Sequence, residues 1–186
     1  FSFIDSMIIF NLLISAIPIV LISLKEDLFH NTSPKNRLLL MILSCLVFFY
    51  INPINFPVID IPFVGKIISF YPMSIIFFTF SVLVVMNGMN FIDGMNGLLG
   101  FTCLFILLGI TTISFLIGDI YIAKIAIILL IPLIFFLLFN FPFGKIFMGD
   151  LGAYFYGFSI SMLTIYFFGK NQNILSWVAI LLLLYP

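Results

Sequence analysis

Apolar runs long enough to cross a bilayer alternate with short polar segments along the whole chain. A membrane-spanning helix needs roughly 20 apolar residues, with a range of about 17–25. The runs show no alternation of apolar and polar positions with a period of two, which a membrane β-barrel would require. The pattern therefore predicts about six complete spanning helices and the beginning of a seventh near Ile174. The complete apolar runs cover residues 7–24, 38–51, 67–86, 98–117, 120–139 and 151–168.

The predicted fold class is all-α, a polytopic transmembrane helical bundle. The run 38–51 is short for a span, so its helix must begin earlier or be partly sheltered by protein. The chain starts at Phe1 without an initiator Met and stops at Pro186 inside an apolar run. We therefore expect it to be a fragment of a larger bundle.

The composition makes lipid the solvent of this protein. Of the residues, 64% are hydrophobic and 8% are charged, whereas about 25% are charged in an ordinary soluble domain. The mean hydropathy is +1.36. The formal net charge is zero, which gives no support for a nucleic-acid partner. Cys45 and Cys103 lie inside apolar runs, so they indicate neither a disulfide framework nor a metal cluster.

The polar segments between the predicted spans alternate between the two sides of the membrane. If every run crosses, segments 25–36, 87–97 and 140–150 emerge on one side. This side has four cations against three on the other, which places it in the cytoplasm by a narrow margin. Its cations are Lys25, Lys35, Arg37 and Lys145, and its acids are Glu26, Asp27, Asp93 and Asp150.

The first polar segment, residues 25–37, joins adjacent carboxylates to several cations. Glu26 and Asp27 have the chemistry to bind a divalent cation or to accept a proton. Lys35 and Arg37 have the charge to hold phosphate. The alternative is a membrane-flanking loop with ordinary interfacial charges, followed by a helix start at Ser33-Pro34.

The second segment, residues 87–100, repeats polar residues and glycines about every third position. On a helix this spacing would gather the polar residues on one face. Polar side chains at membrane depth are costly and usually functional. The alternative is a glycine-rich turn in which Asn and Asp act as local caps. The polar residues are Asn87, Asn90, Asp93 and Asn96.

The third segment, residues 140–152, begins with Asn140 and contains Phe147. Pro142 and Gly144 end one predicted span, and Asp150 opens the next. Asp150 is either a helix cap or a hard oxygen ligand for Mg²⁺ beside a phosphate-binding Lys145. The three segments together put carboxylates, amides and cations on one membrane face, which suits a metal ion and a phosphorylated, nucleotide-linked substrate.

Residues 90–98 (NFIDGMNGL) and 147–154 (FMGDLGAY) resemble two signatures of the polyprenyl-phosphate N-acetylhexosamine-1-phosphate transferases. These are the family 4 glycosyltransferases, which include phospho-N-acetylmuramoyl-pentapeptide transferase. Residues 26–37 resemble the family's acidic-pair loop, and the order and spacing of the motifs agree. The resemblance implies that residues 1–186 form a single transmembrane domain of this family, truncated at both ends and inactive alone.

The resemblance also implies an activity and a location. Members transfer a sugar 1-phosphate from a UDP-N-acetylhexosamine to undecaprenyl or another polyprenyl phosphate and release UMP. This step initiates the synthesis of cell-envelope polysaccharides or of peptidoglycan lipid intermediates. It requires Mg²⁺, with Mn²⁺ as a substitute, and takes place at the cytoplasmic face of the bacterial inner membrane. The implied partners are the two substrates and the lipid bilayer, with a homodimer as an open question.

Carried over by position, the resemblance gives individual residues a role. Asp150 would bind the metal, with Asn90 near the metal and the pyrophosphate. Asp27 would deprotonate or orient the lipid phosphate, with Glu26 beside it and Asp93 as a third catalytic residue. The implied substrate-binding residues are Asn87, Asn96, Asn140, Phe147, Lys145, Lys35 and Arg37, of which Asn96, Asn140 and Phe147 would contact uridine.

Two positions depart from the family's usual pattern. The familiar Asp-Asp pair is Glu26-Asp27 here, and the second Asp of Asp-Gly-x-Asp-Gly is Asn96. Both departures resemble a bacterial branch that serves surface polysaccharide synthesis. The identity of the sugar stays open. The alternatives from other classes are a membrane transporter or channel, and a catalytically inactive membrane scaffold.

Overall fold

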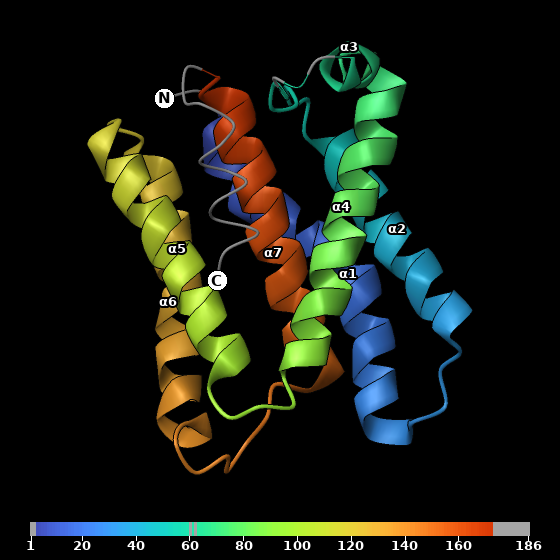
Figure 1. Ribbon diagram of the computed structural model, residues 1–186, viewed down its shortest axis with the longest axis vertical. Helices are drawn as coiled ribbons and strands as arrows, with labels where there is room; N and C mark the ends of the chain where they lie inside the picture. Colours follow the sequence, from blue (N-terminus) through green and yellow to red (C-terminus); the bar gives the residue numbers. More distant parts are fainter. Residues whose placement is uncertain (1–2, 60, 62, 173–186) are drawn as a thin grey trace.

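The computed structural model describes residues 3–59, 61 and 63–172, and helices make up most of these residues (Figure 1). Six of the helices are long and apolar enough to cross a membrane, and α3 is a short helix between two of them. The prediction of an all-α membrane bundle is confirmed. The expected start of a further span near Ile174 lies outside the described residues. The helices are α1 (Phe3–Phe29), α2 (Pro34–Ile51), α3 (Val64–Ile68), α4 (Tyr71–Ile92), α5 (Leu98–Leu116), α6 (Ile120–Asn140) and α7 (Gly149–Lys170).

Helix α2 begins before its apolar run, as one of the two expectations for this short run required. Pro34 occupies the first turn, and the Ser33 hydroxyl accepts a hydrogen bond from the Asn36 N–H at 3.3 Å. A proline in the first turn needs no N–H partner, and serine is a favoured cap. These residues lengthen the helix to 18 residues, which is about 27 Å at 1.5 Å per residue.

Helix α1 extends further than its apolar run. It continues to Phe29, so Glu26 and Asp27 lie in its last turns instead of in a loop. Thr32 stabilises this end because its backbone N–H donates to Glu26 Oε2 at 2.8 Å and its hydroxyl donates to the same oxygen. The connection between α1 and α2 is therefore shorter than the predicted segment 25–36.

The prediction that the polar residues of segment 87–100 share one helix face is wrong for half of them. Helix α4 ends at Ile92, with Asp93 as its C-cap, and α5 starts only at Leu98. Gly97 has φ +79°, a left-handed conformation that glycine adopts easily. Asn87 and Asn90 therefore lie on α4, whereas Asp93 and Asn96 belong to the glycine-rich turn that was the alternative.

Helix α7 is the central helix of the bundle. It packs mainly against α4 and α1, and 83% of its spanning window is buried inside the protein (Figure 1). A Cβ atom at Gly157 would lie 2.9 Å from the Met86 Cα, so glycine permits the close approach of α7 to α4. Helices α5 and α6 pack mainly against each other and form a hairpin beside this core.

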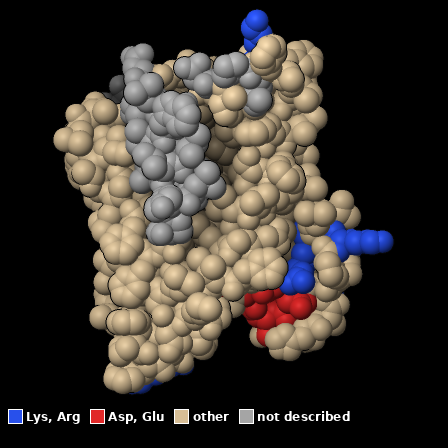
Figure 2. Space-filling model, viewed as in Figure 1, with Lys and Arg blue, Asp and Glu red and all other residues tan. Residues whose placement is uncertain are grey.

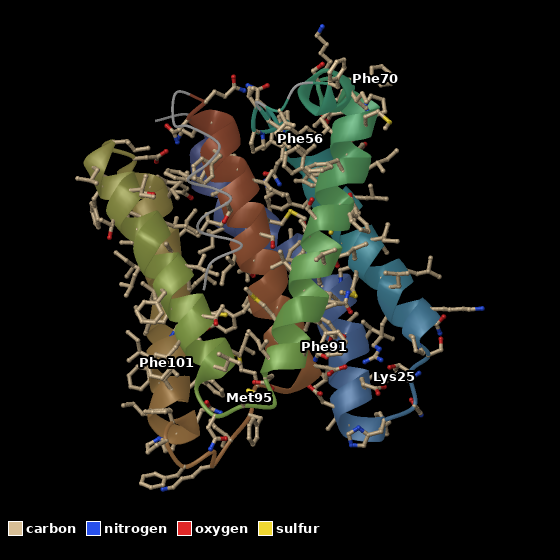
Figure 3. The ribbon with its side chains drawn as sticks, viewed as in Figure 1. Lys25, Phe56, Phe70, Phe91, Met95 and Phe101 are labelled. Atoms are coloured by element: carbon tan, nitrogen blue, oxygen red, sulfur yellow. The ribbon has the colours of Figure 1, made fainter. Side chains whose placement is uncertain are left out.

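The connection after α2 covers the end of the bundle opposite the polar segments. Phe56 stacks on Phe78 of α4, with ring centroids 5.0 Å apart, and also contacts Phe49 of α2. Figure 3 shows Phe56 and Phe70 at this end, whereas Lys25, Phe91 and Met95 lie toward the other. The connection thus packs Phe56 inward against α2 and α4 at this end of the helices.

Replacing Gly169 by Ala is expected to destabilise the protein. A Cβ atom at Gly169 would lie 1.8 Å from the Asn55 carbonyl oxygen, so the connection would have to move away from α7. Overpacking of this kind costs about 1–3 kcal/mol, and it would appear as a lower melting temperature in detergent or nanodiscs. Gly88→Ala is the matched control, because a Cβ atom at Gly88 has no heavy atom within 4 Å. Equal melting temperatures for the two variants would contradict the packing of this connection.

Candidate active site at one end of the bundle

The three predicted polar segments meet at one end of the molecule, the lower end in Figure 1. The end of α1, the turn after α4 and the start of α7 are joined there by hydrogen bonds between side chains and backbone. Figure 2 shows acidic atoms gathered in one patch at this end, with basic atoms next to them. The sequence prediction that these segments share one side is confirmed.

Asp150, in the first turn of α7, connects three helices through its side chain. Its Oδ2 lies 2.6 Å from Nη1 of Arg37 on α2. Its Oδ1 accepts a hydrogen bond of 2.7 Å from Nδ2 of Asn90 on α4. Exposed fractions of 25% for the Arg37 side chain and 19% for that of Asp150 leave the pair accessible to solvent and solutes.

Two other carboxylates bind the peptide N–H groups at the start of α7. The two oxygens of Asp27 accept from the N–H groups of Asp150 and Leu151, at 2.9 Å each. Those of Asp93 accept from Met148 at 3.3 Å and Gly149 at 2.9 Å. The first N–H groups of a helix have no partner within the helix, and negative charge is favourable there. Side chains from α1 and the turn after α4 thus cap α7.

Asp93 is the most enclosed carboxyl of this cluster, with 8% of the residue exposed. Burial raises its pKa above the usual range of an aspartate, and the nearby charges of Asp27 and Asp150 act in the same direction. The hydrogen bonds from Met148 and Gly149 act against this shift. The two N–H donors thus stabilise the charge of a carboxylate that burial alone would disfavour.

A second cluster ties the turn after α4 to the connection between α6 and α7. Asn140 is 1% exposed, and its Oδ1 accepts from the Gly97 N–H at 2.5 Å. Its Nδ2 donates to the Ile146 carbonyl at 2.7 Å. Asn96 adds a 3.1 Å hydrogen bond from its Nδ2 to the Pro142 carbonyl. These contacts hold the two connections side by side next to the carboxylates.

The remaining predicted site residues lie around these two clusters. The Asn87 side chain donates to the Leu83 carbonyl of its own helix at 2.7 Å. The Glu26 carboxylate accepts hydrogen bonds from Thr32. Lys35, Lys145 and Phe147 are exposed at the same end. The structure thus brings Asp27, Asn90, Asp93, Asp150 and Arg37 into one hydrogen-bonded cluster, and Asn96 and Asn140 into another.

The sequence interpretation missed the peptide N–H groups of residues 148–151 as binding partners. Every residue except proline has a peptide N–H group, so the sequence does not indicate which of these groups bind a side chain. The one available signal was Gly149, which has φ +67° and whose added Cβ would lie 2.9 Å from the Asp27 carboxylate. A glycine immediately before an aspartate at a helix start is compatible with many arrangements, so this signal was too weak to identify the contact.

The chemistry of the cluster fits a metal ion that a substrate helps to hold. Within residues 3–59, 61 and 63–172, no group of three or more His, Cys, Asp or Glu side chains is arranged to hold a metal. Mg²⁺ commonly takes one or two carboxylates plus phosphate oxygens and water, without a complete protein cage. The Asp150 carboxylate supplies hard oxygen donors of this type, and the Asn90 amide has a further oxygen, although its Nδ2 is the atom that faces Asp150 in this structure.

Replacing Asn140 by Asp is expected to destabilise the protein although the side chains have the same shape. The carboxylate would face the Ile146 carbonyl at the place where the amide now donates a hydrogen bond. A buried polar group without its partner costs about 1–3 kcal/mol, which thermal unfolding in detergent would detect. The exposed Asn31 offers the matched control Asn31→Asp. A melting temperature for Asn140→Asp that equals the control would contradict this contact.

Comparisons with known proteins identify the family of this chain. The sequence model of glycosyl transferase family 4 matches residues 9–168. The chain is 32% identical to a putative UDP-N-acetylglucosamine–dolichyl-phosphate N-acetylglucosaminephosphotransferase of Sulfolobus acidocaldarius, over 81% of this chain and 46% of that protein. It is 30% identical to a probable undecaprenyl-phosphate N-acetylglucosaminyl 1-phosphate transferase of Bacillus subtilis, over 61% of this chain and 31% of that protein.

A phospho-N-acetylmuramoyl-pentapeptide-transferase of Streptococcus thermophilus is 27% identical, over 74% of this chain and 42% of that protein. The chain thus spans less than half the length of these relatives. No solved structure gives a significant match. The family match covers the described helices from α1 to α7, including every residue of the two clusters. The chain is therefore a member of glycosyl transferase family 4.

Proposed function

We propose that the complete protein transfers a sugar 1-phosphate from a UDP-N-acetylhexosamine to a polyprenyl phosphate and releases UMP. The names of two relatives describe N-acetylglucosamine phosphate transfer to dolichyl or undecaprenyl phosphate. The observation that carries the proposal is the single cluster in which Asp150 contacts both Arg37 and Asn90. A carboxylate, an amide and a guanidinium from three helices suit a reaction between two phosphorylated substrates.

The proposed reaction exchanges one phosphorus–oxygen bond for another. A lipid phosphate oxygen attacks the phosphorus atom that bears the sugar, and the bond from that phosphorus to the UMP oxygen breaks. UMP leaves with the electron pair of the broken bond. With a fully ionised lipid phosphate, the reaction moves no proton. The protein's contribution is then to place the two phosphates in line and to compensate their charge.

Arg37 and the exposed lysines would supply the positive charge of this site. The Arg37 guanidinium presents several N–H donors in a plane, which suits phosphate oxygens. Lys35 and Lys145 are exposed at the same end of the bundle and would add charge without fixed geometry. We further propose that Phe147, which is 49% exposed, contacts the uracil ring. Asn140 would support this contact indirectly, because its hydrogen bonds to Gly97 and Ile146 fix the connection that contains Phe147.

We also propose that Mg²⁺ takes part and that Asp150 and Asn90 hold it. When bound, the ion supplies positive charge that neutralises the diphosphate and stabilises the leaving group. Asp150 would provide a carboxylate oxygen, and Asn90 would provide its amide oxygen after the side-chain amide turns, because its Nδ2 now donates to Asp150. The face that bears the cluster would be cytoplasmic, in a bacterial inner membrane, where the lipid substrate enters from the bilayer between apolar helices.

Replacing Asp150 by Asn is expected to lower UMP release about 100-fold or more, as loss of one well-placed electrostatic group does in other enzymes. The substitution keeps the shape of the side chain but removes its charge. UMP release is measured in membranes that carry the complete reading frame, with UDP-N-acetylglucosamine, undecaprenyl phosphate and Mg²⁺. Asp119→Asn, at the opposite end of the bundle, is the matched control and should retain release.

The same assay separates the proposal from its alternatives. Release that requires both the lipid and the metal, and that Asp150→Asn abolishes, supports a transferase. A folded and inserted protein that releases no UMP with any of a panel of UDP-sugars would instead be a scaffold or a transporter. An ion dependence of transport that shifts in Asp150→Asn would favour the transporter.

A further inference from the structure

The first turn of α7 is held from two sides by carboxylates that come from other helices. Asp27 lies near the end of α1, and Asp93 follows α4. Between them they accept hydrogen bonds from the N–H groups of four consecutive residues, Met148 to Leu151. These are the groups that a helix start leaves without partners. No N–H group of this turn is therefore left free to bind a substrate phosphate.

We propose that Asp27 and Asp93 are positioning residues, which hold the first turn of α7 so that the Asp150 carboxylate faces Arg37 and Asn90. The catalytic consequence of this inference rests on the proposed function, whereas the hold on α7 does not. It differs from the role that the resemblance implies for Asp27, namely to deprotonate or orient the lipid phosphate.

The hydrogen bonds of Asp27 argue against a role as a proton acceptor. Both of its oxygens are engaged, at 2.9 Å from the N–H groups of Asp150 and Leu151. A proton on either oxygen would turn that oxygen from an acceptor toward a donor and would oppose one of these bonds. Uptake of a proton from a substrate would thus loosen the start of α7 during the reaction.

Gly149 gives independent support for the positioning role. Its φ of +67° belongs to the left-handed region, and an added Cβ would lie 2.9 Å from the Asp27 carboxylate. The backbone shape that directs the next two N–H groups at Asp27 therefore favours glycine at this position. The backbone conformation at Gly149 thus allows the Asp27 carboxylate to lie against the first turn of α7.

Asp150 is fixed through both its backbone and its side chain. Its N–H donates to Asp27, while its carboxylate oxygens contact Arg37 and Asn90. If Asp27 lost its charge, the backbone of Asp150 would lose one of these restraints. The carboxylate would then spend less time in the position from which it could bind a cation.

Hydrogen exchange of the purified complete protein in nanodiscs, without metal or substrate, tests the hold on α7. In Asp27→Asn, the N–H groups of Asp150 and Leu151 should exchange about tenfold faster, because an amide nitrogen replaces one of the two oxygens that accept from them, a loss comparable to that of a helix cap. Asp119→Asn is the matched control, because Asp119 also caps a helix, accepting from the Ile122 N–H at the start of α6. The control removes the charge of a capping carboxylate far from the start of α7, and it should leave exchange of residues 148–151 unchanged.

Kinetics distinguish positioning from proton transfer. A positioning role predicts that Asp27→Asn raises the half-saturating Mg²⁺ concentration for UMP release about tenfold, as loss of an outer-shell partner does. At saturating Mg²⁺, the ratio of the variant's rate of UMP release to that of the wild type should be the same above and below pH 6. A phosphate monoester loses its second proton near this pH. If Asp27 instead accepts a proton from the lipid phosphate, the Mg²⁺ requirement should not change, and the variant's rate of UMP release should approach that of the wild type as the pH rises.

Unchanged exchange of residues 148–151 in Asp27→Asn overturns the inference, as does a deficit that higher pH relieves at an unchanged Mg²⁺ requirement. If the wild-type protein releases no UMP, the proposed function fails, and the exchange experiment still decides whether Asp27 holds α7. If Asp27→Asn does not fold, Gly149→Ala replaces it, since its methyl group displaces the Asp27 carboxylate without removing it. Unchanged exchange in Gly149→Ala also overturns the inference.

Discussion

The start of α7 is the constraint on which the arrangement of this protein depends. A helix that begins at a membrane face presents several N–H groups that need acceptors. Here Asp27 and Asp93 supply all the acceptors for residues 148–151. This can happen only if α1 and α4 both end beside the start of α7. The same two helices provide most of the packing around α7, which is the most buried of the six spans. Capping and packing therefore select the same neighbours.

The capping carboxylates also explain how several acids lie close together. Asp93 is buried and near two other carboxylates, conditions that disfavour its charge. The positive end of the α7 dipole and the N–H groups offset this repulsion. Asp150 is compensated differently, by the guanidinium of Arg37. Of the three aspartates, Asp150 therefore has the charge partner that a substrate phosphate would compete for.

The spans and the shared side of the polar segments were predictable because both follow from patterns along the chain. The apolar runs predicted the six spans. Because successive connections alternate between the two sides of the membrane, the same runs also predicted that Asp27, Asp93 and Asp150 lie on one side. The capping of α7 was not predictable, because its donors are peptide N–H groups, which every residue except proline has. The end of α4 at Ile92 was also missed, since a spacing of three residues suits either a continuous helix or a glycine turn.

The second cluster has a different role from the first, because it joins parts of the bundle that pack weakly. The α5–α6 hairpin packs mainly on itself, and it is tied to the rest at this end by two short connections. Asn140 and Asn96 bond these connections to each other. Side chain–backbone hydrogen bonds therefore hold the two connections of the hairpin together at this face. The position of exposed residues such as Phe147 next to the carboxylate cluster therefore depends on these bonds.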